Sequence, residues 1–155
     1  MIQFTVGTEI ARPPAEVFAY VTDPTKLATW QTNTISAVAE DDQPLGLGTR
    51  VREVHRAPGG KQLASLVEVS EYDPDRVFAL RMLEGALPIH ARITFEQTEV
   101  GTRLQLDAHG QPSGFVRLAQ PVLRLTLKRQ FAGYCATLKE VLESASPTTR
   151  SSALT

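Results

Sequence analysis

Glu53 and His55 are the residues of this sequence whose types and spacing best suit chemistry. They stand two positions apart in a stretch, residues 49–56, that predicts a β-strand, where alternate side chains point to one face. Same-face neighbours lie roughly 7 Å apart along a strand, so one substrate or water can touch both. A histidine can act as general base or acid near neutral pH, and the glutamate can orient it or the ligand.

The orientation of this pair has two alternatives. Strand alternation places Glu53 and His55 on an inward face, together with Val51. A bulge that shifts the register would instead turn both residues toward solvent, among the arginines of the same stretch. These arginines favour the outward orientation, and we expect them to outweigh the alternation; they are Arg50, Arg52 and Arg56.

The remaining reactive residue types are isolated. The three histidines lack the spacing of metal ligands, and no phosphate-binding glycine loop or nucleophile elbow occurs, so neither a metal nor a cofactor is predicted. His90 alternates with polar residues and is expected on the outer surface. His109 ends the last strand and is expected as a solvated residue at the rim of a pocket. Cys135 has apolar neighbours and is expected as a buried structural thiol.

Length and composition indicate one ordinary globular domain. The chain has 155 residues, of which 42% are hydrophobic and 21% charged, which is enough for a core and leaves no room for a second full domain. The formal net charge of −1 argues against nucleic acid as a partner. The first residues lack the basic and apolar regions of a signal peptide and no apolar run is long enough to span a membrane, so neither secretion nor a membrane span is expected. With its single cysteine, the chain is expected in a reducing cytoplasm.

The elements that must position the pair follow from hydrophobic periodicity. Residues 2–10 alternate as a strand, Pro13-Pro14 stops it, and a short helix follows, ended by Asp23-Pro24. Residues 25–30 predict a second short helical turn. Turn signals then divide the chain into six further strands, which indicates an antiparallel sheet; they cover residues 35–40, 49–56, 63–72, 77–83, 89–97 and 102–109.

After residue 112 the apolar period changes from 2 to about 3.6 and predicts one long helix over residues 115–143. Pro121 lies inside this pattern, so a kink or a segmented start is expected rather than a simple start at Pro121. The terminal helix also carries a basic face, formed by Arg124, Lys128 and Arg129. We expect this face to be solvated; the minor alternative is that it docks on an acidic carrier protein or an anionic membrane. Residues 1–143 are expected to form one α+β domain, and residues 144–155 a disordered Ser/Thr-rich tail.

This order of elements resembles the helix-grip, or START-like (SRPBCC), superfamily, and within it the polyketide cyclase/dehydrase and lipid-transport family. The resemblance covers residues 2 to about 143 and is carried by short motifs in the right order. These are residues 11–18, Thr22-Asp23-Pro24 with Trp30, Leu45-Gly46-Leu47-Gly48-Thr49, Asp73-Pro74-Asp75-Arg76 and Gly101-Thr102-Arg103-Leu104.

The resemblance implies a curved seven-stranded antiparallel sheet wrapped around the long C-terminal helix, with two short helices between the first two strands. It also implies a cavity between sheet and helix for a small hydrophobic ligand, with a solid core as the alternative. Combined with strand and helix alternation, it predicts a pocket lined by Trp30, Val51, Glu53, His55, Phe78, Leu80, Met82, Ile89, Ala91, Ile93, Leu104, Leu106, Ala108, Leu118, Val122 and Leu125.

Three functions are compatible with such a fold. The first is the binding of an apolar or aromatic small molecule, lipid-like or polyketide-like. The second is an aromatase/cyclase or dehydratase of the polyketide type, in which Glu53 and His55 move protons. The third is a protein-interaction module, which an exposed apolar patch would favour. Whether any reaction is catalysed is left open, as is a homodimer.

Overall fold

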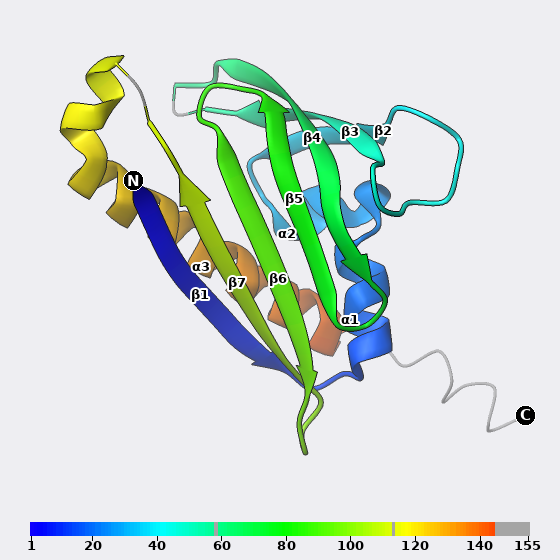
Figure 1. Ribbon diagram of the computed structural model, residues 1–155. Coiled ribbons are helices and arrows are strands. Elements are labelled where there is room, and N and C mark those ends of the chain that lie inside the picture. Colours follow the sequence, from blue (N-terminus) through cyan, green and yellow to red (C-terminus); the bar gives the residue numbers. More distant parts are fainter. Residues whose placement is uncertain (58, 113, 145–155) are drawn as a thin grey trace, which may run out of the picture.

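Seven antiparallel strands form one curved sheet in the computed structural model, which describes residues 1–57, 59–112 and 114–144 (Figure 1). The strand order is β1-β7-β6-β5-β4-β3-β2, so consecutive strands from β2 to β7 are neighbours and β1 closes the other edge. Every strand begins and ends within one residue of its predicted bounds: β1 (Ile2–Ile10), β2 (Thr34–Ala39), β3 (Arg50–Arg56), β4 (Gln62–Asp73), β5 (Val77–Glu84), β6 (Ile89–Gln97) and β7 (Thr102–Gly110).

Short helices join β1 to β2, as predicted: α1 (Pro14–Val21), the 3₁₀ turn η1 (Pro24–Lys26) and α2 (Leu27–Trp30). Helix α1 begins at Pro14, directly after Pro13. A proline is accepted at this position because the N–H it lacks would have no acceptor within the helix. Asp23 starts η1 by accepting a hydrogen bond from the Thr25 backbone N–H at 2.9 Å. The helix-grip arrangement is therefore confirmed, with α1 at one end of the sheet (Figure 1).

The long helix α3 (Gln120–Ser144) crosses the inner face of the sheet and is tied along β1. Arg124 Nε donates to the Gln3 carbonyl at 2.8 Å near the start of the helix. Near its end, Lys139 Nζ donates to the Glu9 carbonyl at 2.7 Å. There, Glu143 accepts from the Ala11 N–H at 2.8 Å. The pKa of Glu143 is lowered, most strongly by its hydrogen bond with Lys139 and next by the one from the Ala11 N–H. These contacts hold α3 along β1.

The start of the terminal helix is segmented. A 3₁₀ turn, η2 (Gly114–Ala119), precedes α3, and Pro121 lies in the first turn of α3, where its missing N–H costs nothing. One continuous helix from residue 115 is therefore a wrong prediction, whereas a segmented start is right. The predicted tail lies outside the described residues, apart from Ser144, which ends α3. Among the helices that the structure describes, none combines the length and the apolarity of a membrane crossing.

An aromatic cluster closes the end of the core next to α1. The Phe18 ring of α1 meets Tyr72, Phe78 and Phe95 edge to face, with ring centroids 5.4, 6.3 and 5.2 Å away. Such geometry adds roughly 0.5–1.5 kcal/mol per pair beyond area burial. Helix α1 thereby fills one end of the concave face with side chains. Space for a ligand remains only toward the opposite end, where α3 begins.

Candidate functional site

A cavity of about 250 Å³ lies between the concave sheet face and α3, beyond the aromatic cluster. Most of its wall is apolar, and its polar groups gather on the side of β3 and α2. The lining residues are Gln31, Asn33, Glu53, His55, Leu63, Ala64, Ser65, Val67, Leu80, Met82, Ala86, Leu87, Ile89, Ala91, Ile93, Leu106, Leu127, Gln130, Phe131 and Tyr134. The concave face is thus not filled by a solid core, and the site is an apolar pocket with one polar end.

Half of the residues assigned to the pocket from the sequence lie along it. They are the ones on β3, β5, β6 and β7 beyond the reach of α1: Glu53, His55, Leu80, Met82, Ile89, Ala91, Ile93 and Leu106. Strand alternation places them there because it fixes which face each side chain shares.

Five others are packed into the core instead. Strand alternation predicts which face of the sheet a side chain lies on, but not whether the space beside it is open. At these five positions other side chains fill that space. Phe78 belongs to the aromatic cluster at α1, and Trp30 meets Tyr134 edge to face with centroids 6.5 Å apart. Val51, Leu104 and Ala108 are buried on the inner face outside the cavity. These five assignments are corrected accordingly.

The helix residues assigned to the pocket point the wrong way. Leu118, Val122 and Leu125 are 85%, 69% and 47% exposed, whereas Leu127 and Phe131 line the cavity. Residues two apart on an α-helix lie about 200° apart around its axis, so Leu125 and Leu127 cannot share a face. The apolar residues of the terminal helix therefore lie on two opposite sides.

Glu53 and His55 face the pocket, contrary to the expectation that the arginines would turn them outward. Strand β3 keeps its alternation, because the register shift lies in β2, between Thr34 and Ser36. The arginines occupy the opposite face and find acidic partners there: Arg52 Nε lies 3.1 Å from Glu40, and Arg50 Nε lies 3.4 Å from Glu68. Arg81 and Arg50 together lower the pKa of Glu68. Outward arginines are therefore compatible with an inward pair.

A chain of hydrogen bonds fixes the pair. His55 Nε2 lies 2.9 Å from Glu53 Oε1, and His55 Nδ1 lies 3.1 Å from the hydroxyl of Thr34. Both contacts are satisfied when Nε2–H donates to the carboxylate and the Thr34 hydroxyl donates to Nδ1. Both ring nitrogens are then engaged by the protein. The second carboxylate oxygen of Glu53 is the group that can act on a ligand, and His55 is the residue that positions it.

The α3 side of the polar end presents a phenol that stays protonated. The Tyr134 hydroxyl donates to Asn33 Oδ1, which joins α3 to the segment before β2. Burial raises the pKa of Tyr134 above its ordinary value; a hydrogen bond with Gln130 opposes this, and the nearby negative charge of Glu53 adds to it. Tyr134 therefore acts as the hydrogen-bond donor to Asn33 and not as a base.

Ser65 is the unsatisfied group of the site. It lies opposite Glu53 in the β3–β4 register, and its side-chain oxygen is buried without a hydrogen-bond partner among the described residues. A buried hydroxyl left without a partner costs on the order of 1–3 kcal/mol. Because Ser65 lines the cavity, a bound molecule can supply the missing hydrogen bond.

Several lining residues escaped the sequence-based assignment. Ser65 could have been found, because it alternates with Leu63 and Val67 on one strand. Asn33, Gln31 and the residues of the β5–β6 turn carry no periodic signal, and only the tertiary fold brings them to the pocket. Tyr134 lies in the predicted terminal helix, but its hydrogen bond with Asn33 joins residues that are 101 positions apart in the chain.

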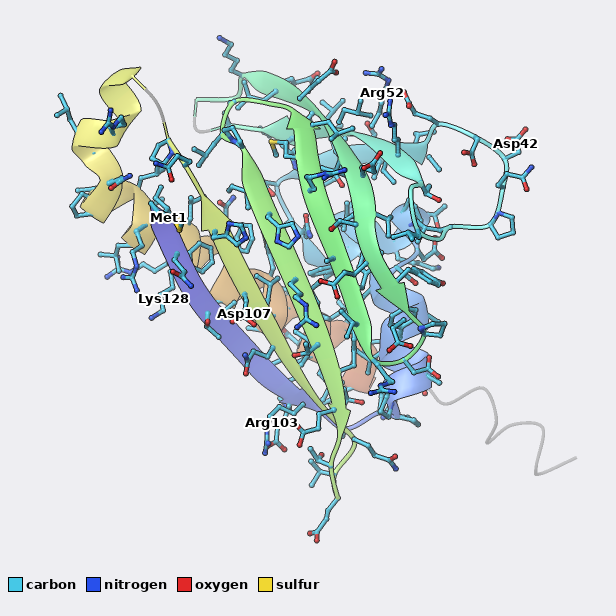
Figure 2. All side chains as sticks on the ribbon, in the orientation of Figure 1. Met1, Asp42, Arg52, Arg103, Asp107 and Lys128 are labelled. Carbon is cyan, nitrogen blue, oxygen red and sulfur yellow. The ribbon has the colours of Figure 1, made fainter. Side chains whose placement is uncertain are left out.

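The other reactive residues lie away from the pocket. His90 is on the outer face, because its neighbours Ile89 and Ala91 line the cavity. His109 pairs with it across the strands, with ring centroids 4.9 Å apart, and so is not at the pocket rim. Figure 2 shows Arg103 and Asp107 of β7 projecting from this same outer face.

Burial raises the pKa of Cys135 to about 11, which fits an inert thiol. Within the described ranges, no cluster of three or more ligating side chains suits a metal ion.

A curved antiparallel sheet that encloses a ligand-sized pocket against one long helix defines the helix-grip class of proteins. Solved structures share this fold with the chain. TTHA0849 from Thermus thermophilus has a TM-score of 0.79 at 21% identity, covering 94% of this chain and 99% of that one. MLL2253 from Mesorhizobium loti has a TM-score of 0.70 at 18% identity, covering 94% and 99%. Ara h 8.0201 has a TM-score of 0.74 at 15% identity, covering 92% and 98%.

The chain belongs to the polyketide cyclase/dehydrase and lipid transport family, whose model matches residues 1–143. A search of the curated proteins finds no match. Family membership sets the fold, and the residues of the pocket must supply the argument for what it binds.

Proposed function

We propose that this protein binds a small, uncharged apolar or aromatic molecule that carries one hydroxyl or carbonyl group. The observation that carries this proposal is the buried Ser65 hydroxyl, which faces the polar end of a mostly apolar cavity and lacks a partner among the described residues. A ligand oxygen placed beside Ser65 would satisfy that hydroxyl. The carbon skeleton of the ligand would lie against Leu80, Ile93 and Phe131.

The volume of the cavity limits the size of the ligand. An engineered apolar cavity of about 150 Å³ accommodates benzene, so about 250 Å³ accommodates one or two fused rings or a short acyl chain. A long poly-β-ketone chain or an extended two-chain lipid would not be enclosed. Among lipid-like and polyketide-like molecules, the pocket therefore suits the small ones.

The charge of the pocket limits the chemistry of the ligand. Glu53 is 8% exposed and is the only carboxylate among the lining residues, while Lys and Arg are absent from that lining. A ligand carboxylate would bring a second negative charge next to Glu53 in a poorly solvated site, where like charges repel strongly. A neutral hydroxyl can instead donate to Glu53 and accept from Ser65. The pocket is expected to discriminate against fatty-acid-like anions.

A matched series of naphthalene derivatives tests this proposal. At pH 7 we expect 2-naphthol to bind at least about tenfold more tightly than naphthalene or 2-naphthoate, because a hydrogen bond to a charged group contributes roughly 1.5–3 kcal/mol. The measurement is fluorescence or calorimetric titration. Ser65→Ala should reduce the ratio of the binding affinities for 2-naphthol and naphthalene about three- to tenfold. Preferred binding of naphthoate, or no binding of any of the three, would contradict the proposal.

A second candidate function is acid–base catalysis of the cyclase or dehydratase type, and the Glu53–His55–Thr34 chain favours it. Glu53 would remove a proton from the carbon next to a ligand carbonyl, and the C–H electron pair would form an enolate. The Ser65 hydroxyl can donate to the enolate oxygen. The enolate carbon then attacks a second carbonyl, whose oxygen receives the C=O electron pair and takes the proton from Glu53; alternatively, the enolate carbon takes that proton back itself. His55 holds the carboxylate in place.

The proton-removal step can be tested separately from binding, with the bicyclic ketone 1-tetralone. In D₂O the protein should speed the exchange of hydrogen at C2, followed by NMR, since a positioned general base contributes about 10²–10⁴-fold. Glu53→Gln should abolish this acceleration while 2-naphthol still binds, and His55→Gln should reduce it. Exchange at the buffer rate with wild-type protein would rule out the catalytic candidate and leave the binding function intact.

A further inference from the structure

We propose that the start of the terminal helix docks this protein on an anionic lipid surface. The docking element is the exposed stripe, defined as Leu118, Val122 and Leu125, together with the basic residues beside it. This interaction surface lies outside the pocket, and its function does not depend on what the pocket binds.

The exposed stripe is apolar surface that the fold leaves uncovered. Val122 and Leu125, three residues apart, lie on one face of α3, and Leu118 lies in the 3₁₀ turn η2 directly before it; all three are exposed large hydrophobic side chains. Leu123 and Leu127 pack against the core from the opposite side of the same helix. Figure 1 shows η2 and the first turns of α3 extending beyond the ends of β1 and β7. An amphipathic helix whose second apolar side faces solvent marks an interaction site.

The charge around the exposed stripe is of one sign. Between Asp107 and Glu140 the chain contains no Asp or Glu, although the whole protein is close to neutral. Arg117, Lys128 and Arg129 form no ion pair within the part of the chain that the structure describes. The basic residues in this interval are Arg117, Arg124, Lys128, Arg129 and Lys139.

The basic charge has a definite position on the molecule. On the ideal helix Arg129 continues the line of Val122 and Leu125, because seven and four residues bring the chain back to the same side. Arg124 holds this part of the helix against β1 through the Gln3 carbonyl. In the view of Figure 2, Lys128 and Met1 both appear at that edge of the molecule, and Met1 is itself exposed.

An anionic lipid surface fits this combination better than a second copy of the chain. A symmetric dimer built on the exposed stripe would place the same patch on both sides, so that Arg129 and Lys128 would approach their own equivalents. Acidic headgroups attract such residues, and the apolar side chains can enter the headgroup boundary. The same helix lines the pocket through Leu127 and Phe131, so docking would bring the pocket of an apolar ligand next to a source of apolar molecules.

A fluorophore beside the exposed stripe gives a direct test. Cys135 is buried, so a cysteine at Thr126→Cys can be labelled alone with an environment-sensitive dye. We expect its emission to shift to the blue with vesicles of phosphatidylcholine and phosphatidylglycerol, but not with phosphatidylcholine alone. The shift should weaken as salt rises, because salt screens exposed charges. A dye at Val38→Cys, on exposed β2, should show no shift.

Two variants separate the apolar and basic contributions. In the labelled protein, Leu118→Ser with Val122→Ser and Leu125→Ser should abolish the shift, and Lys128→Glu with Arg129→Glu should weaken vesicle binding at least about tenfold. Melting curves check that both variants stay folded.

Three results would overturn the proposal. One is vesicle binding that requires neither the anionic lipid nor the exposed stripe, seen as equal binding to both vesicle types or as full binding by the serine variant. Another is a dimer, seen by light scattering, that the serine variant converts to monomer, which would assign the surface to a second copy. The third is a monomer that binds neither vesicle type, which would leave an acidic protein as the occupant to seek.

Discussion

Ala91→Phe is expected to weaken the binding of 2-naphthol more than about 100-fold, a loss of roughly 2.8 kcal/mol. Ala91 lies on β6, and its small side chain borders the cavity. A phenyl ring in its place would project between the sheet and α3 and occupy much of the space that a bicyclic ligand needs. Titration with 2-naphthol measures the loss directly.

Protein stability separates this result from simple misfolding. A side chain that fills a cavity commonly adds about 0.5–2 kcal/mol to the free energy of unfolding, so Ala91→Phe should melt no lower than the wild type. The matched control is Ala136→Phe, which adds the same ring to an exposed position of α3 and should bind normally. Unchanged binding by a folded Ala91→Phe variant would show that 2-naphthol binds elsewhere.

Gly101→Ala is expected to lower the free energy of unfolding by about 3 kcal/mol or more, through backbone strain and a clash. Gly101 has φ 151°, a conformation that side chains rarely adopt. A methyl group there would lie 2.7 Å from Arg12 N and closer still to the Ile10 carbonyl. The corner cannot easily open, because the buried Thr102 hydroxyl donates to the Arg12 carbonyl at 2.7 Å. Urea denaturation followed by circular dichroism measures the change.

Gly133→Ala provides the matched control. Gly133 lies within α3, and a methyl group added there meets nothing within 4 Å. Alanine favours a helix over glycine by about 0.8–1.0 kcal/mol, so this substitution should raise stability slightly. If Gly101→Ala lay within about 1 kcal/mol of the wild type, the β1–β7 corner would be less constrained than its geometry indicates.

Local patterns were sufficient to predict most of the fold. Alternation on β6 placed Ile89, Ala91 and Ile93 on the inner face, and the structure has them there. The motif Asp23-Pro24 was correctly read as the break between two short helices. These predictions succeed because strand period, proline geometry and capping depend on residues close together in the chain.

The predictions for the candidate site failed where long-range contacts decide. Alternation places Phe78 on the inner face, but the ring of Phe18 from α1 packs against it and fills that end of the concave face. Leu125 and Leu127 both belong to the apolar pattern of the terminal helix, and only the tertiary packing, together with the ties from Arg124 and Lys139 to β1, selects which of them faces the sheet. The predicted direction of Glu53 and His55 is likewise wrong, since the arginines of β3 find partners on β4 and just after β2.

The amino-acid sequence by itself determined that this chain forms a curved antiparallel sheet around a long helix, and that Glu53 and His55 share one side of a strand. Periodicity carries that information, because it repeats over each segment independently of the others. The tertiary structure alone decided that the cavity stays open at one end, that Ser65 and Tyr134 join Glu53 there, and that the exposed stripe remains uncovered. Each of these depends on segments far apart in the chain meeting at a fixed register, which no local pattern specifies.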